Sequence, residues 1–225
     1  MNRGNRMNPL NRFLLVTAAC AIPAVAFAQG QPDVSFDGLV QVDRGEFKLV
    51  YVDPDVDFSV YNKFIPGPAT FQFRAVKKTS SAVARRHNQT EYWISDKDKQ
   101  KLEDVVTSIF ADELAKSEVF TEVNQPGPDT LIIRGALHDI VSQVPPELTG
   151  RGEIWLSSVG EATLIIEALD SLSGEVIYRA IERRAAQRPG RQMVVSNTVT
   201  TWQEVRRLAR LWASHLREAM DSVQE

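Results

Sequence analysis

One stretch of the chain, from Gly160 to Arg184, constrains its fold more than any other. Two apolar arms, centred on Leu164–Ile166 and Val176–Tyr178, flank the segment Asp170–Gly174. That segment is rich in Asp, Ser and Gly, which favour turns because the polar side chains bond nearby backbone and Gly tolerates positive φ. A hairpin alone is marginal in water. The stretch therefore predicts a β-hairpin that packs its apolar face on other elements.

Two amphipathic patterns predict helices that cover this hairpin, one over residues 96–118 and one over 201–223. Ser95 can cap the first helix, because its hydroxyl is placed to accept from a backbone amide of the first turn. Glu113 falls close to the middle of the apolar stripe of that helix. It either turns outward at the rim or is a partly buried carboxylate paired with a basic side chain. We favour the outward position, because an unpaired buried carboxylate is costly.

Extended segments near 47–52, 61–76 and 130–141 supply further strands. Together the segments predict one α+β domain: a two-layer sandwich with a mainly antiparallel sheet of four or five strands and two long helices on one face. In the hairpin we expect Glu167 to pair with Arg179 and Arg183 on the wet face. We expect inward-facing side chains at these positions: Ala162, Leu164, Ile166, Val176, Tyr178 and Ala180.

The first 28 residues are typical of a cleavable export signal. Arginines precede an apolar run from Phe13 to Phe27, which at about 15 residues is too short to span a bilayer. Ala26 and Ala28 match the small-x-small cleavage pattern, so the mature chain begins at Gln29. The sequence thus predicts a signal peptide over 1–28, a flexible lead-in over 29–46 and a single domain over 47–225, located in the periplasm or secreted.

Cys20 offers an alternative, because a small residue precedes it as in lipid-modified envelope proteins. Lipidation there would anchor the chain to the outer membrane. Thr17 fits such a signal poorly and apolar sequence continues past the cysteine, so we favour cleavage before Gln29. The mature chain then has no cysteine and no apolar run long enough for a transmembrane helix.

Charge narrows the range of partners. The net charge of −3 becomes about −6 when the leader is removed, because it carries three arginines and no acidic residue. This balance argues against non-specific binding of nucleic acid, which needs a basic surface. Basic residues nonetheless cluster, and two interpretations are open. We favour simple charge balancing with nearby Glu182, Glu204 and Glu218. The alternative is a face for an anionic partner made of Lys77, Lys78, Arg85, Arg86, Arg206 and Arg210.

Residues suited to catalysis are few, and we predict that the protein is not an enzyme. Its three histidines lack the spacing of a metal set, and His138 and Asp139 are adjacent on a strand, where side chains point to opposite faces. Neither a nucleophile elbow nor a glycine-rich phosphate loop occurs. The sequence predicts no cofactor, no metal and no catalytic residue.

Several short motifs carry a resemblance to a known family: the run from Tyr51–Pro54 to Tyr61, Pro126–Pro128, Glu167–Ser171 with Ser173–Glu175, and Trp212. Their order over roughly residues 36–223 resembles the bacterial envelope family catalogued as domain of unknown function 3313. The resemblance implies an exported, often lipid-modified protein with no assigned activity. It transfers no catalytic residue.

Two functions follow as expectations. The favoured one is a non-enzymatic accessory protein of the cell envelope that binds another envelope component. The alternative is a module that binds a small molecule or lipid in a cavity between sheet and helices. A lined apolar cavity would favour the second, and a flat aromatic or basic patch the first.

Overall fold

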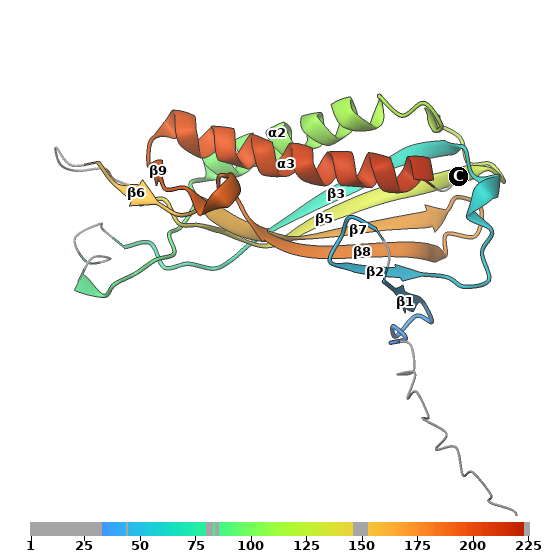
Figure 1. Cartoon of the computed structure of the whole chain (residues 1–225), viewed down its shortest axis with the longest axis horizontal. Coiled ribbons are helices and arrows are strands. Elements are labelled where there is room, and N and C mark those ends of the chain that lie inside the picture. The colour runs from blue at the N-terminus through green and yellow to red at the C-terminus, as the bar shows by residue number, and fades with distance from the viewer. Residues whose placement is uncertain (1–32, 44, 80–82, 84–85, 146–152, 223–225) are drawn as a thin grey trace, which may run out of the picture. The chain divides into compact units, whose positions relative to one another are not determined.

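The computed structural model describes residues 33–43, 45–79, 83, 86–145 and 153–222. A seven-stranded sheet carries both long helices on one face (Figure 1). The strands of this sheet are β1 (Val40–Val42), β2 (Leu49–Val52), β3 (Lys63–Phe73), β4 (Thr121–Glu122), β5 (Thr130–Ser142), β7 (Gly160–Asp170) and β8 (Val176–Ala185). The remaining elements are α2 (Asp96–Leu114), α3 (Thr198–Asp221), a small sheet of β6 (Trp155–Leu156) and β9 (Val194–Val195), and short 3₁₀ helices at Phe58–Val60 and Pro189–Arg191.

The strand order is β1-β2-β8-β7-β5-β3-β4. β3 pairs in parallel with both β5 and β4, and the other neighbouring pairs are antiparallel. The predicted mainly antiparallel sheet of four or five strands is therefore wrong: the sheet is mixed and has seven strands. The parallel pair arises because α2 lies between β3 and β5 in the chain, and a helix is the usual crossover between parallel strands.

β3 lies within the extended segment predicted over 61–76. The strand runs through Pro66-Gly67-Pro68 with a register shift between Pro66 and Ala69. Proline has no amide hydrogen and is tolerated where a strand edge is free. β4 pairs only with Lys63 and Phe64, so beyond them the outer edge of β3 has no partner among the strands that the structure describes.

The hairpin at the centre of the sheet has the predicted register in part: Arg183 lies opposite Thr163 and does not bond Glu167, and Ile177 is buried in place of Val176. Glu167 lies opposite Arg179, and Arg179 Nε donates to Glu167 Oε1 at 2.7 Å. Arg134 on β5 donates to the same carboxylate at 2.6 Å. These charges lie on the face turned away from the helices. Arg179 also binds Asp37 at 2.6 Å, and this hydrogen bond is the main reason that the pKa of Asp37 falls to about 2.

The core fills the space between helices and sheet. On β7, Ala162, Leu164, Ile166 and Ala168 are buried and alternate with partly exposed residues, as expected for a strand with one covered face. A smaller cluster of Val159, Ala186 and Val194 lies apart from this core. Leu208 of α3 packs against both clusters.

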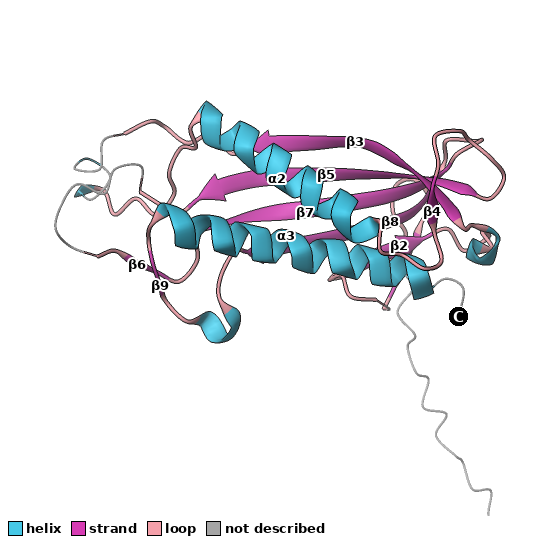
Figure 2. Ribbon diagram, turned by 90° about the horizontal axis from the view of Figure 1, so that it is seen from above, coloured by secondary structure: helices cyan, strands magenta, loops and turns pink. Residues whose placement is uncertain are grey.

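Local capping fixes where the helices begin. Ser95 Oγ accepts from the backbone amide of Asp98 at 3.1 Å, as predicted. Asn197 and Thr200 form a reciprocal capping box at the start of α3. Both helices begin at the same end of the sheet, and they lie farther apart there than at their C-terminal ends (Figure 2).

At the C-terminal ends, polar side chains join the two helices. Arg217 of α3 donates to Glu113 of α2 at 3.3 Å and to Asp221 at 2.9 Å, while Ser117 donates to Asp221 at 2.5 Å. We name these four residues, with Lys116, the clasp. The Glu113 side chain is 14% exposed and is also paired with Lys116, so the outward position predicted for it is wrong. It is the paired, partly buried carboxylate of the second alternative.

Candidate functional site: a cavity between helices and sheet

A partly open cavity of about 450 Å³ lies where α2 and α3 diverge. Most of its lining is apolar and comes from both helices and from the sheet. The principal apolar residues are Trp93, Ile94, Leu102, Val106, Leu137, Ile140, Val144, Val159, Ala162, Ala186, Trp202, Val205, Leu208, Ala209 and Trp212. The volume falls within the range of small-molecule sites, roughly 300–1,000 Å³.

Small residues in the walls help to keep this space open. Ala162 on β7, Ala186 after β8 and Ala209 on α3 all line it, and each is buried. Gly160, also in the lining, lies so close to β5 that an added Cβ would be 2.4 Å from the Val141 carbonyl oxygen. The cavity lies between the main core and the smaller cluster, since residues of both line it.

Polar groups of the lining are mostly engaged with the protein itself. Ser95 bonds Asp98, Ser142 Oγ accepts from the Val144 amide at 3.0 Å, and Asn197 caps α3. In the described part of the chain, this lining contains no histidine beside a serine or cysteine, so it lacks the pairing that activates a nucleophile. The apolar side chains of this lining can bury the hydrocarbon chain of a ligand.

The mouth of the cavity is at the first turns of the two helices. Asp98, Asn197 and Thr198 are the lining residues classed as exposed, and they belong to these turns. Two lysines stand against tryptophans of the wall. Lys101 Nζ is 4.1 Å from the centre of the Trp202 ring, and Lys78 Nζ is 4.4 Å from that of Trp93.

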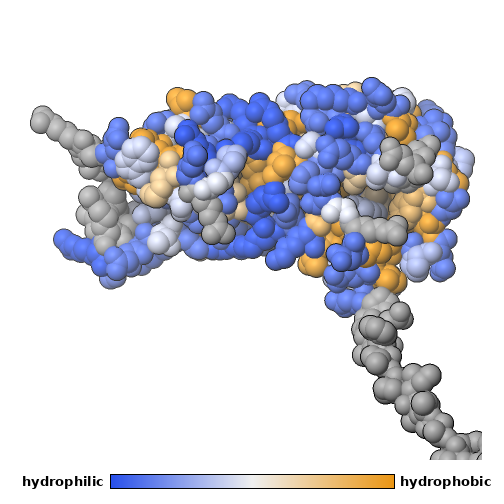
Figure 3. Space-filling view, viewed as in Figure 1, coloured by the Kyte–Doolittle hydropathy of each residue, from blue (hydrophilic) through white to orange (hydrophobic). Residues whose placement is uncertain are grey.

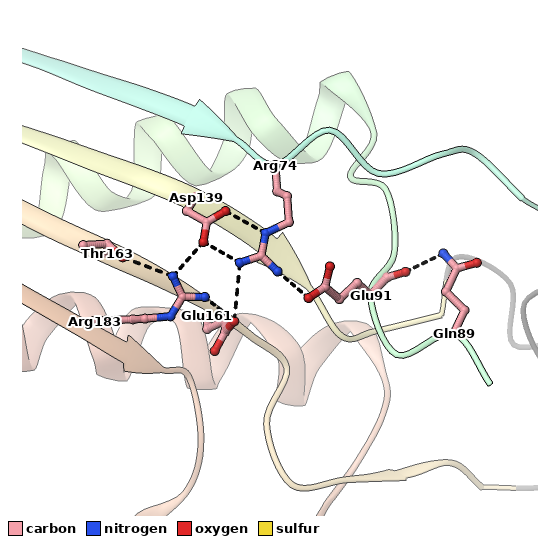
Figure 4. A network of polar contacts seen from close by, with 7 residues as sticks. All are labelled: Arg74, Gln89, Glu91, Asp139, Glu161, Thr163 and Arg183. Atoms are coloured by element: carbon pink, nitrogen blue, oxygen red, sulfur yellow. Dashed lines mark hydrogen bonds and ion pairs between the residues drawn. The ribbon is translucent and has the colours of Figure 1, made fainter. Parts of the chain in front are cut away.

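A network of ion pairs flanks the cavity (Figure 4). Asp139 accepts from Arg74 Nε at 2.6 Å and from Arg183 Nη1 at 2.6 Å. Arg183 also donates to Glu161 at 2.5 Å, and Arg74 is paired with Glu91. Glu161 contributes to the cavity lining. The network joins the ends of β3, β5, β7 and β8 to the segment before α2.

Asp139 takes part in this network because the strand is irregular there. Its φ is +55°, within a register shift between His138 and Val141, so the simple alternation expected for His138 and Asp139 does not hold. Hydrogen bonds from Arg74 and then Arg183 hold the pKa of Asp139 well below its usual range. A carboxylate with so low a pKa is a poor general base at neutral pH. The network is suited to joining strands, not to proton transfer.

The described residues of the predicted anionic-partner face belong to two parts of the fold. Lys77 and Lys78 follow β3, and Arg86 lies farther along the same connection. Arg206 and Arg210 instead line a shallow groove between α2 and α3, with Asp104 on the opposite side. The other predicted site residues lie outside the described residues: Cys20, Ala26, Ala28, Gln29 and Arg85.

Sequence reasoning identified no residue of the cavity as a ligand contact. The residues of the lining that the sequence could have indicated as ligand contacts are Trp93 and Trp202, because each is a large aromatic residue next to a predicted helix start. Within the described residues, no group of His, Cys, Asp or Glu is arranged to hold a metal ion. No helix of that same part has the length and apolar character needed to cross a bilayer.

Comparison with known proteins identifies the family. The model of the family described as protein of unknown function (DUF3313) matches residues 33–216. The chain belongs to this family. The resemblance seen in the short sequence motifs is thereby confirmed for this DUF3313 protein. A search of curated proteins found no match.

Solved structures show only distant similarity to this DUF3313 protein. A PelC dodecamer from Paraburkholderia phytofirmans is 13% identical, with 78% of this chain and 96% of that chain covered and a TM-score of 0.34. Protein XCC0632 from Xanthomonas campestris is 11% identical, with 85% and 93% covered and a TM-score of 0.37. At these TM-scores neither structure supports an assembly or a ligand for this protein.

Proposed function

We propose that this DUF3313 protein is a non-enzymatic binding module that takes an apolar or amphiphilic small molecule into the cavity between α2, α3 and the sheet. One observation supports it above all: the cavity of about 450 Å³ has walls made largely of tryptophan, leucine, valine and alanine side chains. Burying a hydrocarbon chain against such walls is favourable, at about 25 cal/mol per Å² of apolar surface.

The proposed compartment is the cell envelope, reached by cleavage after Ala28. Its support is the sequence of the leader, with arginines, an apolar run and the Ala26-x-Ala28 pattern. Lipid attachment at Cys20 is the alternative form of the same export. The intact mass of the mature protein distinguishes the two, because the first gives an N-terminus at Gln29 and the second a lipidated Cys20.

The binding test uses N-phenyl-1-naphthylamine, a neutral fluorophore that brightens in apolar sites, followed by displacement with dodecanoate. We expect saturable binding by the mature chain and loss of at least tenfold in affinity for Ala162→Leu. Ala162 faces the cavity, so the added side chain occupies the ligand's space.

Ala136→Leu is the matched control. Ala136 is also on the sheet, but it pairs with Ile165 on the face turned away from the helices. Its variant is expected to bind like the natural protein. Equal affinity in all three proteins would show that the fluorophore binds elsewhere, and the proposal would fail.

A second candidate, a protein that binds an acidic envelope partner, has one specific observation in its favour. Arg206 and Arg210 line the shallow groove between the helices, and neither has an ion pair with a described carboxylate. Pull-down from envelope extract with the mature chain and with Arg206→Gln/Arg210→Gln tests it. A partner retained equally by both proteins would argue against this groove.

A further inference from the structure

We propose that the end of the molecule around the cavity mouth docks on an anionic membrane, which supplies the amphiphile. The inference rests on the proposed function and adds to it a surface and a source. Its two parts are an exposed apolar tip, made of Trp155, Met193 and Val199, and two lysines, Lys78 and Lys101, against the tryptophans of the mouth.

The apolar tip follows from strand geometry. In the β6–β9 pair, Leu156 lies opposite Val194, which is buried in the smaller cluster. Side chains alternate along a strand, so Trp155 and Met193 point the other way. Trp155 is 53% exposed and Met193 is 50% exposed. Large apolar side chains gathered on one exposed tip indicate an interaction site.

The tip adjoins the mouth. One residue after β9 come Asn197 and Thr198, which line the cavity, and then Val199, which is 66% exposed. Hydrophobic side chains are visible at the end of the molecule that carries β6 and β9 (Figure 3). The segment that follows β3 extends toward the same end of the molecule (Figure 1), and Lys77 and Lys78 belong to that segment.

The charges at the mouth favour an anionic surface. Lys78 and Lys101 lie over tryptophan rings and, within the described residues, have no carboxylate within ion-pair distance. Two nearby carboxylates are engaged: Asp96 pairs with Lys99 and also interacts electrostatically with Lys78, and Asp98 accepts from Ser95. Both remain exposed negative charges that oppose docking.

Membrane chemistry accounts for both parts together. Tryptophan prefers the interface between headgroups and acyl chains, and lysines beside it are attracted to anionic lipids. A second copy that met this tip symmetrically would bring like cations together. A bilayer also contains many apolar acyl chains. When docked in this way, it would lie against the mouth of the cavity and could supply a ligand to it.

The experiment measures co-flotation of the mature chain with vesicles of phosphatidylcholine, alone or with 30% phosphatidylglycerol. We expect binding only to the anionic vesicles, and weaker binding as salt is raised. Trp155→Ala should weaken it about tenfold. Lys78→Gln/Lys101→Gln should weaken it about fivefold or more per lysine removed. Asp98→Asn should strengthen it.

Two control variants alter equivalent side chains elsewhere. Leu172→Ala removes another exposed apolar side chain, 64% exposed, in the β7–β8 turn. Lys48→Gln removes an exposed lysine just before β2. Both should bind vesicles like the natural chain. Unchanged circular dichroism spectra would show that all these variants are folded.

The outcomes separate this inference from the proposed function. Membrane docking is overturned if the protein binds N-phenyl-1-naphthylamine but no vesicles. It is also overturned if vesicle binding is the same without Trp155 and without anionic lipid. Neither result contradicts ligand binding in the cavity. A Trp155-dependent dimer in sedimentation, with no vesicle binding, also overturns it and makes the tip an interface between copies. Vesicle binding without loading leaves the docking surface and removes the cavity function.

Discussion

At their C-terminal ends α2 and α3 are joined by the clasp, with Arg217 between Glu113 and Asp221, whereas at their N-terminal ends the cavity separates them. The same two helices lie on the same sheet at both ends. Large side chains such as Phe64 and Phe120 fill the clasp end, while Ala162 and other small residues line the cavity end. The comparison indicates that helix divergence and a few small residues of the walls, not a different fold, create the space, since tryptophans line it as well.

The largest expected difference between the ends concerns leucine truncation. Leu216→Ala, at the clasp end, removes a side chain that is 3% exposed and should lower the free energy of unfolding by about 2–5 kcal/mol. Leu102→Ala removes a partly exposed side chain that already borders empty space, and should cost about 1 kcal/mol. Urea denaturation measures both. Equal losses would show that the cavity end is packed as tightly as the clasp end.

Enlarging two alanines of β7 should reveal the same asymmetry. Ala168→Leu inserts volume into the filled part of the core and should destabilise by about 1–3 kcal/mol. Ala162→Leu places its side chain in the cavity, so its stability should stay within about 1 kcal/mol of the natural protein. Thermal melts compare the two. A larger loss for Ala162→Leu would contradict the assignment of free space beside it.

The clasp is expected to contribute less to the free energy of unfolding than the core side chains do. Arg217→Ala removes charged hydrogen bonds of a partly exposed group and should cost about 1 kcal/mol. Hydrogen exchange should then rise in the last turns of both helices and remain unchanged near the cavity. Exchange that rises first at the N-terminal turns would mean that the clasp does not hold this end.

The smallest effect is a dependence on pH. The hydrogen bond from Lys116, and then that from Arg217, lower the pKa of Glu113 below its ordinary value of 4.5. A lowered pKa stabilises the folded state above pH 4.5, and this contribution is lost as pH falls through the folded pKa. The stability difference between the natural protein and Glu113→Gln should therefore be constant above pH 5.5 and shrink in acid. A difference that grows in acid would have the wrong sign.

The period of two in the central hairpin predicted only part of its register. Glu167 opposite Arg179 and the inward Ala162, Leu164 and Ile166 follow from alternation. Val176 does not, because the register shift between Ala168 and Leu169 buries Ile177 in its place. The strand count failed because β1 and β4 have three and two residues, too few for a periodic signal.

The cavity could not be predicted from the alternation of residues along the strands. Ala162 was predicted to face inward, but a sequence does not say whether the space opposite an inward alanine is filled. That depends on the angle between α2 and α3, which is set by contacts far apart in the chain such as Ser117–Asp221. Asp139 joined Arg74 and Arg183 through a local irregularity that alternation cannot foresee.

The most direct test of the central claim is a methyl NMR titration of the mature chain with dodecanoate. If dodecanoate binds in the cavity, the methyl resonances of Leu102, Leu208 and Val205 shift and saturate. Those of Leu114 and Leu216, at the clasp end, do not shift. Shifts that appear equally at both ends, or at the clasp end alone, would contradict a binding site where the two helices begin.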